Sequence, residues 1–177
     1  MGKIGVLEHP LNYKILHIMN NNESTYSTEL ARVLNKDQGN IGKRISLLHQ
    51  NNFIKKGKRT KAQHYKVSFE GLFDEFKDIL QSLVSLQDKE LPEGVFDSDV
   101  LFEFYKLYVQ DYLRSNSDGT IRKMVFEDFF AGLQVADNVG DSFPGDVKDL
   151  YSVLKSVVGG VASSYISVKY ALDNCED

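Results

Sequence analysis

Five polar side chains between positions 38 and 46 carry the chemical groups that read the edges of DNA bases. They are Gln38, Asn40, Lys43, Arg44 and Ser46. An arginine or a lysine matches the two acceptors of guanine, and an asparagine or a glutamine matches the donor and acceptor of adenine. Because an α-helix fits into the major groove, these residue types on one helix would give sequence-specific contacts with double-stranded DNA.

A helix over residues 38–50 would position these side chains. Asp37 is a good N-cap for it, and the carboxylate suits the positive end of the helix dipole. Ile41, Ile45 and Leu48 follow at spacings of i, i+4 and i+7. This spacing predicts one buried stripe, which leaves the polar residues on the other faces.

Two glycines interrupt the same segment, at Gly39 and Gly42. Glycine is a poor helix former, so something other than helix propensity must favour it here. Close approach of the backbone to a bound surface is one explanation, and close packing on the preceding helix is the other. Both stay open on the sequence alone.

Two helices should precede this segment. His9-Pro10 opens the first, since proline has no amide hydrogen to lose at a helix start, and Asn20-Asn21-Asn22 ends it. Ser27 is a credible N-cap for the second helix. Asn35 should end that helix in a left-handed conformation.

A basic β-hairpin is expected from Phe53 onward. On its return strand, Tyr65, Val67 and Phe69 predict a buried face and alternate with His64, Lys66 and Ser68. The tip contains Lys58, Arg59, Lys61 and Gln63 and no large apolar group. We expect this tip to lie along a phosphate backbone or in a minor groove, where His64 would join the phosphate contacts.

Positive charge is concentrated in the helix and the hairpin. Residues 36–66 hold nine basic side chains and one acidic side chain, whereas residues 67–177 hold nine basic and twenty-one acidic ones, and the net charge of the chain is -4. A local basic footprint of this kind is what phosphate binding requires. A solvated lysine-rich loop is the alternative interpretation.

These residues also carry a family resemblance. The pattern consists of Leu30-Ala31, Ile41, Arg44, Leu48, Asn52-Phe53-Ile54 and Tyr65-Lys66-Val67-Ser68-Phe69-Glu70-Gly71. It resembles the winged helix-turn-helix of MarR-type and ArsR-type transcription regulators of prokaryotes and archaea, over about residues 8–86. The resemblance implies that Gln38, Asn40, Lys43 and Arg44 read the major groove and that Lys58, Arg59 and Lys61 make the wing contacts. Asn52 stands where the family usually has glycine, and asparagine also reaches the left-handed region.

The rest of the chain reads as helical and acidic. An amphipathic helix over residues 72–87 connects the DNA-binding domain, residues 1–71, to a helical C-terminal domain, residues 88–177. In regulators of the family this helix often mediates dimerisation, and packing within the chain is the alternative. Further helical patterns cover about residues 100–112, 121–136 and 144–174. Thirteen of the twenty aromatic residues lie from Phe96 onward. We expect them to form either core or the lining of a pocket for a small apolar effector.

No pattern in the chain indicates an enzyme. Glycine-rich phosphate loops, paired-cysteine metal sites and nucleophile elbows do not occur in the sequence. The four histidines lack ligand spacing, so we expect neither a metal site nor a cofactor. The longest uncharged stretch, residues 156–168, falls short of the ~20 residues that span a bilayer. A single cysteine, Cys175, suits the reducing cytoplasm.

The sequence therefore predicts a mainly α fold with a small β-hairpin wing, in which an N-terminal winged helix-turn-helix precedes a C-terminal helical domain. Its predicted function is sequence-specific binding of double-stranded DNA by a cytoplasmic, homodimeric transcription regulator that contacts no membrane. Two alternatives stay open. One is a winged-helix adaptor between proteins, and the other is an architectural protein that binds DNA without sequence preference.

Overall fold

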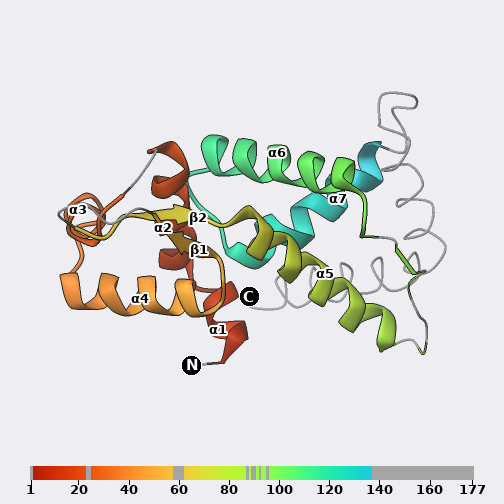
Figure 1. The fold of residues 1–177 in the computed structure, drawn as a ribbon, viewed down its shortest axis with the longest axis horizontal. Coiled ribbons are helices and arrows are strands. Elements are labelled where there is room, and N and C mark those ends of the chain that lie inside the picture. Colours follow the sequence, from red (N-terminus) through yellow and green to blue (C-terminus); the bar gives the residue numbers. More distant parts are fainter. Residues whose placement is uncertain are drawn as a thin grey trace, which may run out of the picture. The chain divides into compact units, whose positions relative to one another are not determined.

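The computed structural model describes residues 2–22, 25–57, 62–86, 88, 91, 93–94 and 96–136, without the side chains of 133–136. Over these ranges the chain is mainly helical, with one small antiparallel hairpin, as predicted (Figure 1). In chain order the elements are α1 (Lys3–Leu7), α2 (Pro10–Asn21), α3 (Ser27–Val33), α4 (Gln38–Gln50), β1 (Ile54–Lys56), β2 (Tyr65–Val67), α5 (Phe69–Ser85), α6 (Asp99–Ser115), a π-helical segment (Lys123–Glu127) and α7 (Asp128–Ala136). The helix predicted over 144–174 lies outside the described residues.

The chain forms two compact units, and neither is continuous in sequence. One combines residues 1–76 with residues 104–132, and the other combines residues 77–103 with residues 133–177. The first unit therefore takes residues from both sides of the boundary predicted at residue 88. The assignment of DNA binding and dimerisation to two separate domains stays a prediction.

The first predicted helix is confirmed as α2. The ring of His9 caps it by accepting a hydrogen bond from the amide of Leu11 at 3.1 Å, and Pro10 is its first residue. The short helix α1 before it was not predicted. Its residues Val6 and Leu7 are buried, but five residues are too few to give a clear helical period.

α3 begins one residue earlier than predicted. Tyr26 occupies the N-cap position and Ser27 is already helical, without a side-chain cap, so the prediction of Ser27 as N-cap was wrong. The end of α3 is as predicted, because Asn35 is left-handed with φ of 49°. The amide of Lys36 donates to Ala31 O and that of Asn35 to Arg32 O, which is the hydrogen-bond pattern of a Schellman motif.

The hairpin follows α4 through a second motif of the same kind. Asn52 is left-handed, with φ of 61°, and the amide of Phe53 donates to Leu48 O at 2.9 Å. Phe53 and Leu48 are both fully buried, at the two positions where apolar residues commonly accompany this turn. Asparagine thus supplies the left-handed residue that this turn requires.

In the hairpin, β1 and β2 pair with Ile54 opposite Val67 on the buried side. Tyr65 pairs on its other side with Thr25, the residue two before α3. The return strand is shorter than predicted, because Phe69 is the first residue of α5 rather than the end of the strand. Ser68, predicted to be exposed, is buried because its hydroxyl accepts from the amide of Gly71 at 3.3 Å.

Aromatic rings form the core of the first unit. Tyr105 and Phe129 lie with their ring centroids 5.1 Å apart, and each lies within 5.4 Å of the ring of Phe76. The end of α6 also holds α2, since Asn20 donates to Gln110 O at 3.1 Å and Tyr13 donates to O of Asn116, the residue after α6, at 2.8 Å. In the second unit the described buried residues are Leu80, Val84 and Leu101.

Candidate nucleic-acid interface

The predicted recognition helix is confirmed as a helix by α4, which spans Gln38–Gln50. Asp37 caps it, since its carboxylate accepts a hydrogen bond from the amide of Asn40 at 2.9 Å. The predicted stripe of Ile41, Ile45 and Leu48 is buried. One face of α4 is therefore fixed against the protein, and the opposite face is available.

The face opposite the buried stripe consists of exposed residues at helical spacing. They are Gly39, Lys43, Ser46 and Gln50, at i, i+4, i+7 and i+11. Gln38 and Asn40 in the first turn are exposed as well. Among the described residues, the side chains of Gln38, Asn40, Lys43 and Ser46 have no hydrogen-bond or ion-pair partner. We call these four residues, together with Gln50, the polar face of α4, in which Gln38 lies before Ile41 at the N-terminal end of the stripe rather than opposite it.

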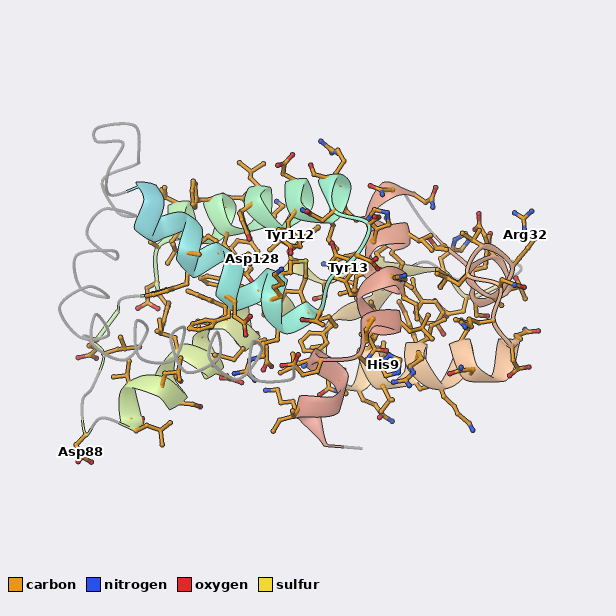
Figure 2. The ribbon with its side chains drawn as sticks, turned by 180° about the vertical axis from the view of Figure 1, so that it is seen from behind. His9, Tyr13, Arg32, Asp88, Tyr112 and Asp128 are labelled. Atoms are coloured by element: carbon orange, nitrogen blue, oxygen red, sulfur yellow. The ribbon has the colours of Figure 1, made fainter. Side chains whose placement is uncertain are left out.

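Arg44 lies apart from this face. It is half-buried at the border of α4, and its Nη2 lies 2.7 Å from Nε2 of His9 at the N-terminus of α2. Figure 2 shows His9 between the start of α2 and the α4 ribbon. Burial is the larger cause that lowers the pKa of His9 below its usual value, and the positive charge of Arg44 is the second cause. Sequence spacing could not show this contact, because 35 residues separate the two positions.

The two glycines of α4 have different surroundings. A Cβ on Gly39 would lie 2.9 Å from the capping oxygen of Asp37, so glycine leaves room for the cap. A Cβ on Gly42 would meet nothing within 4 Å. Close packing on the preceding helix therefore does not explain Gly42, which lies between the polar face and the buried stripe.

The hairpin brings like charges together. Lys55 and Lys66 are direct cross-strand partners and both are exposed, an arrangement that destabilises a free hairpin. Glu70 offsets it in part, with a carboxylate oxygen 3.1 Å from Lys55 Nζ. A hydrogen bond from its own backbone amide, and then Lys55, hold the pKa of Glu70 below its usual value against the opposing effect of burial.

Two of the predicted wing contacts fold back onto the hairpin. The side-chain amide of Gln63 donates to Gly57 O at 3.2 Å and to His64 O at 2.9 Å. The ring of His64 lies against the ring of Tyr26, with 3.9 Å between the centroids. These two residues thus shape the base of the wing. The predicted contacts at Lys58, Arg59 and Lys61 lie outside the described residues.

Several exposed cations near this interface were not named as contacts, although three of them lie in the basic wing predicted over residues 55–66. They are Arg32, Lys36, Lys55, Lys56 and Lys66. Arg32 points away from α3 into solvent (Figure 2). The alternation of β2 and the local excess of positive charge were the signals that would have suggested Lys66, whereas the exposure of Arg32 depends on how α3 packs.

A second polar cluster lies away from α4. The hydroxyl of Tyr112 donates to the carboxylate of Asp128 at 2.6 Å, and the ring of Tyr13 meets that of Tyr112 edge to face (Figure 2). Burial, and then the nearby Asp118 and Asp128, raise the pKa of Tyr13 to about 12. The rings pack on one another, as core side chains do. Nine of the thirteen aromatic residues behind the predicted effector pocket lie within the described residues 96–136, and the other four lie outside the described ranges, so the pocket stays a prediction.

Comparison of the chain with protein-family models, with curated proteins and with solved structures gave no match. Within the described ranges, no group of three or more His, Cys, Asp or Glu side chains could hold a metal ion. In the same ranges, no helix is both long enough and apolar enough to cross a membrane. The interface must therefore be interpreted from its own geometry and charge.

Proposed function

We propose that this chain binds double-stranded DNA as a winged helix-turn-helix protein, with α4 in the major groove and the β1–β2 hairpin as the wing on the flanking backbone. The observation that carries the proposal is the polar face of α4. It presents amide, ammonium and hydroxyl groups that lack partners among the described residues, and its Lys43, Ser46 and Gln50 lie on the side opposite the buried stripe. These groups are those that hydrogen-bond to base edges and phosphates.

The order of the elements supports this proposal. α2, the bridge at Thr25, α3, α4 and the hairpin β1–β2 follow one another in the order of the winged helix-turn-helix regulators that the sequence resembles. α3 and α4 are joined by a turn of four residues, 34–37, with Asn35 left-handed. A short turn between two such helices is typical of DNA-binding proteins of this class.

The charge of the hairpin supports the role of a wing. Lys55, Lys56 and Lys66 are exposed next to one another in two short strands. A phosphate between Lys55 and Lys66 would replace a repulsion by two attractions, so the hairpin gains most from a ligand with closely spaced negative charges. This argument favours nucleic acid over a protein partner of mixed charge.

As a regulator the protein would act as a homodimer in the cytoplasm, and its two half-sites would lie about one helical turn of DNA apart. The dimer interface and the half-site spacing belong to this proposal. Contacts of the polar face with base edges would give sequence preference, while contacts of the wing with phosphates would add affinity for any sequence.

A titration of the full chain tests the proposal against random-sequence duplex and against an oligonucleotide pool under selection, at two salt concentrations. We expect salt-sensitive binding and enrichment of an inverted repeat. Salt-sensitive binding without enrichment would favour an architectural protein, and absence of binding to either pool at low salt would refute DNA binding and favour an adaptor.

Two charge-matched variants sharpen the test. Lys43→Ala removes one positive charge from the polar face, and Arg114→Ala removes one from an exposed position near the end of α6. We expect Lys43→Ala to weaken binding about tenfold or more and Arg114→Ala to change it less than twofold, because exposed charges act over about one Debye length. Equal effects of the two variants would indicate attraction by overall charge rather than a site on α4.

A further inference from the structure

Arg44 and the amide of Leu11 compete for the single acceptor nitrogen of the His9 ring. Nδ1 of His9 lies 3.1 Å from the amide nitrogen of Leu11, and its Nε2 lies 2.7 Å from Nη2 of Arg44. Both partners can only donate a hydrogen bond. A neutral imidazole has one acceptor nitrogen and one N–H, and a protonated imidazole has no acceptor. His9 can therefore accept from the Leu11 amide or from Arg44, but never from both.

The alternatives have different consequences for the protein. If Nε2 accepts from Arg44, then Nδ1 carries the hydrogen and α2 loses its side-chain cap. If Nδ1 accepts from Leu11, then α2 is capped, and Nε2–H faces a guanidinium from which it cannot accept a hydrogen bond. Release of Arg44 from His9 thus restores the α2 cap, and the free energy needed for release is reduced by the strength of a cap.

We propose that His9 is a positioning residue that holds Arg44 beside α2 in the free protein and releases it to an acceptor on bound DNA, while the His9 ring changes tautomer to cap α2. The inference rests on the proposed DNA binding by α4. It explains why an arginine on the recognition helix is half-buried against another helix: its position at the border of α4 places it within reach of both His9 and the polar face.

The charges near His9 are consistent with a neutral ring. Arg44 faces it from α4, and the neighbouring carboxylate of Glu8 is held by Arg122 at 3.3 Å. Burial and then Arg44 lower the pKa of His9, so the ring is neutral near pH 7 and its tautomer is the relevant variable. No proton needs to enter or leave the ring overall, since one nitrogen loses the hydrogen that the other gains through solvent.

The first test uses the free protein and does not depend on DNA. Nitrogen-15 NMR of the His9 ring reports which nitrogen carries the hydrogen, at pH 7.5, in the wild type, in Arg44→Ala and in Lys43→Ala. We expect Arg44→Ala to move the ring toward the tautomer with hydrogen on Nε2 and to slow hydrogen exchange of the Leu11 amide. Lys43→Ala, at the position just before Arg44, should leave the tautomer and the exchange rate unchanged. The same tautomer in wild type and Arg44→Ala would refute the competition.

The second test measures affinity for the selected duplex. His9→Ser keeps a capping hydroxyl but is too short to reach Arg44, so the hydrogen bond between residue 9 and Arg44 is removed. We expect the variant to bind about fivefold more tightly than the wild type. In the wild type, release of Arg44 breaks a charged hydrogen bond to His9 and restores the α2 cap, and the fivefold factor is the difference between the two. In an Arg44→Ala background His9→Ser should change affinity less than twofold. A residue that only caps α2 would change stability without this dependence on Arg44.

The outcomes separate the two proposals. If the wild type binds DNA, its His9 ring should change tautomer on saturation with duplex, whereas an unchanged tautomer or an unchanged affinity of His9→Ser would refute the release of Arg44. His9→Asn, a second capping residue, serves if His9→Ser does not fold. If the wild type binds no DNA, the proposed function fails and the release of Arg44 fails with it. The free-protein NMR result would still decide whether Arg44 and Leu11 compete for His9.

Discussion

Replacement of Gly71 by alanine should markedly lower the melting temperature and the urea midpoint of this protein, whatever its ligand. A Cβ on Gly71 would lie 1.8 Å from the carbonyl oxygen of Asn52 and 2.7 Å from the carbonyl carbon. Carbon and oxygen atoms in contact lie about 3.3 Å or more apart, so α5 and the turn after α4 must separate by roughly 1.5 Å.

Neither side of this contact can move freely. Asn52 is the left-handed residue of the turn, and the amide of Phe53 next to it donates to Leu48 O at 2.9 Å. On the other side the amide of Gly71 donates to the hydroxyl of Ser68. Overpacking of this kind destabilises by about 1–3 kcal/mol and at times more. Alanine recovers up to about 1 kcal/mol of helix propensity, so we expect a net loss of about 2 kcal/mol or more.

A matched substitution exists in the same chain. Gly42→Ala is also a glycine-to-alanine change inside a helix, but its Cβ would meet nothing within 4 Å. We expect it to stabilise the protein by about 0.5–1 kcal/mol through helix propensity alone. Urea denaturation followed by circular dichroism at 222 nm measures both variants. For a chain of this length each kcal/mol moves the melting temperature by roughly 2–4 °C. A Gly71→Ala midpoint equal to or above that of the wild type would refute the packing argument.

Three other predictions concern the interface and the tyrosine cluster. Arg44→Ala should weaken a specific complex by about 1–3 kcal/mol and relax base preference, as measured by competition with random duplex, and equal loss on both duplexes would contradict base reading. Lys66→Ala should weaken all sequences alike and lower the slope of log K against log salt by about one unit, and an unchanged slope would remove β2 from the interface. Because the pKa of Tyr13 is raised to about 12, the unfolded chain loses its proton first, so stability should fall as pH rises from about 10 toward 12. Urea midpoints at pH 9 and 11 measure this fall, and Tyr13→Phe should reduce it.

Local rules were enough to predict α4. Its cap at Asp37, its buried stripe, and the left-handed residues Asn35 and Asn52 all follow from interactions within a few positions of the chain. These features were predictable because neighbouring residues supply the capping and turn hydrogen bonds.

Predictions that depended on tertiary contacts were less successful. Phe69 continued the alternation of β2 in sequence, yet it begins α5, because Ser68 turns the chain by bonding to Gly71. Tyr26 rather than Ser27 occupies the N-cap position of α3, without a side-chain hydrogen bond. Gln63 was predicted as a polar tip residue but closes the base of the wing. At Phe69 and Gln63 a short-range pattern was overridden by a hydrogen bond that the pattern could not specify.

Three features that lower the stability of the folded protein involve residues between 36 and 67. Gly42 weakens a helix without any packing reason, Lys55 opposes Lys66, and Arg44 competes with the α2 cap for His9. Sequences that otherwise follow local rules tend to break them at functional sites, because the compensation comes from the ligand. A polyanion that approaches the backbone of α4 closely would offset all three at once: it fills the space at Gly42, neutralises the lysine pair and accepts from Arg44. A protein partner would do the same only if it placed carboxylates at both the lysine pair and Arg44.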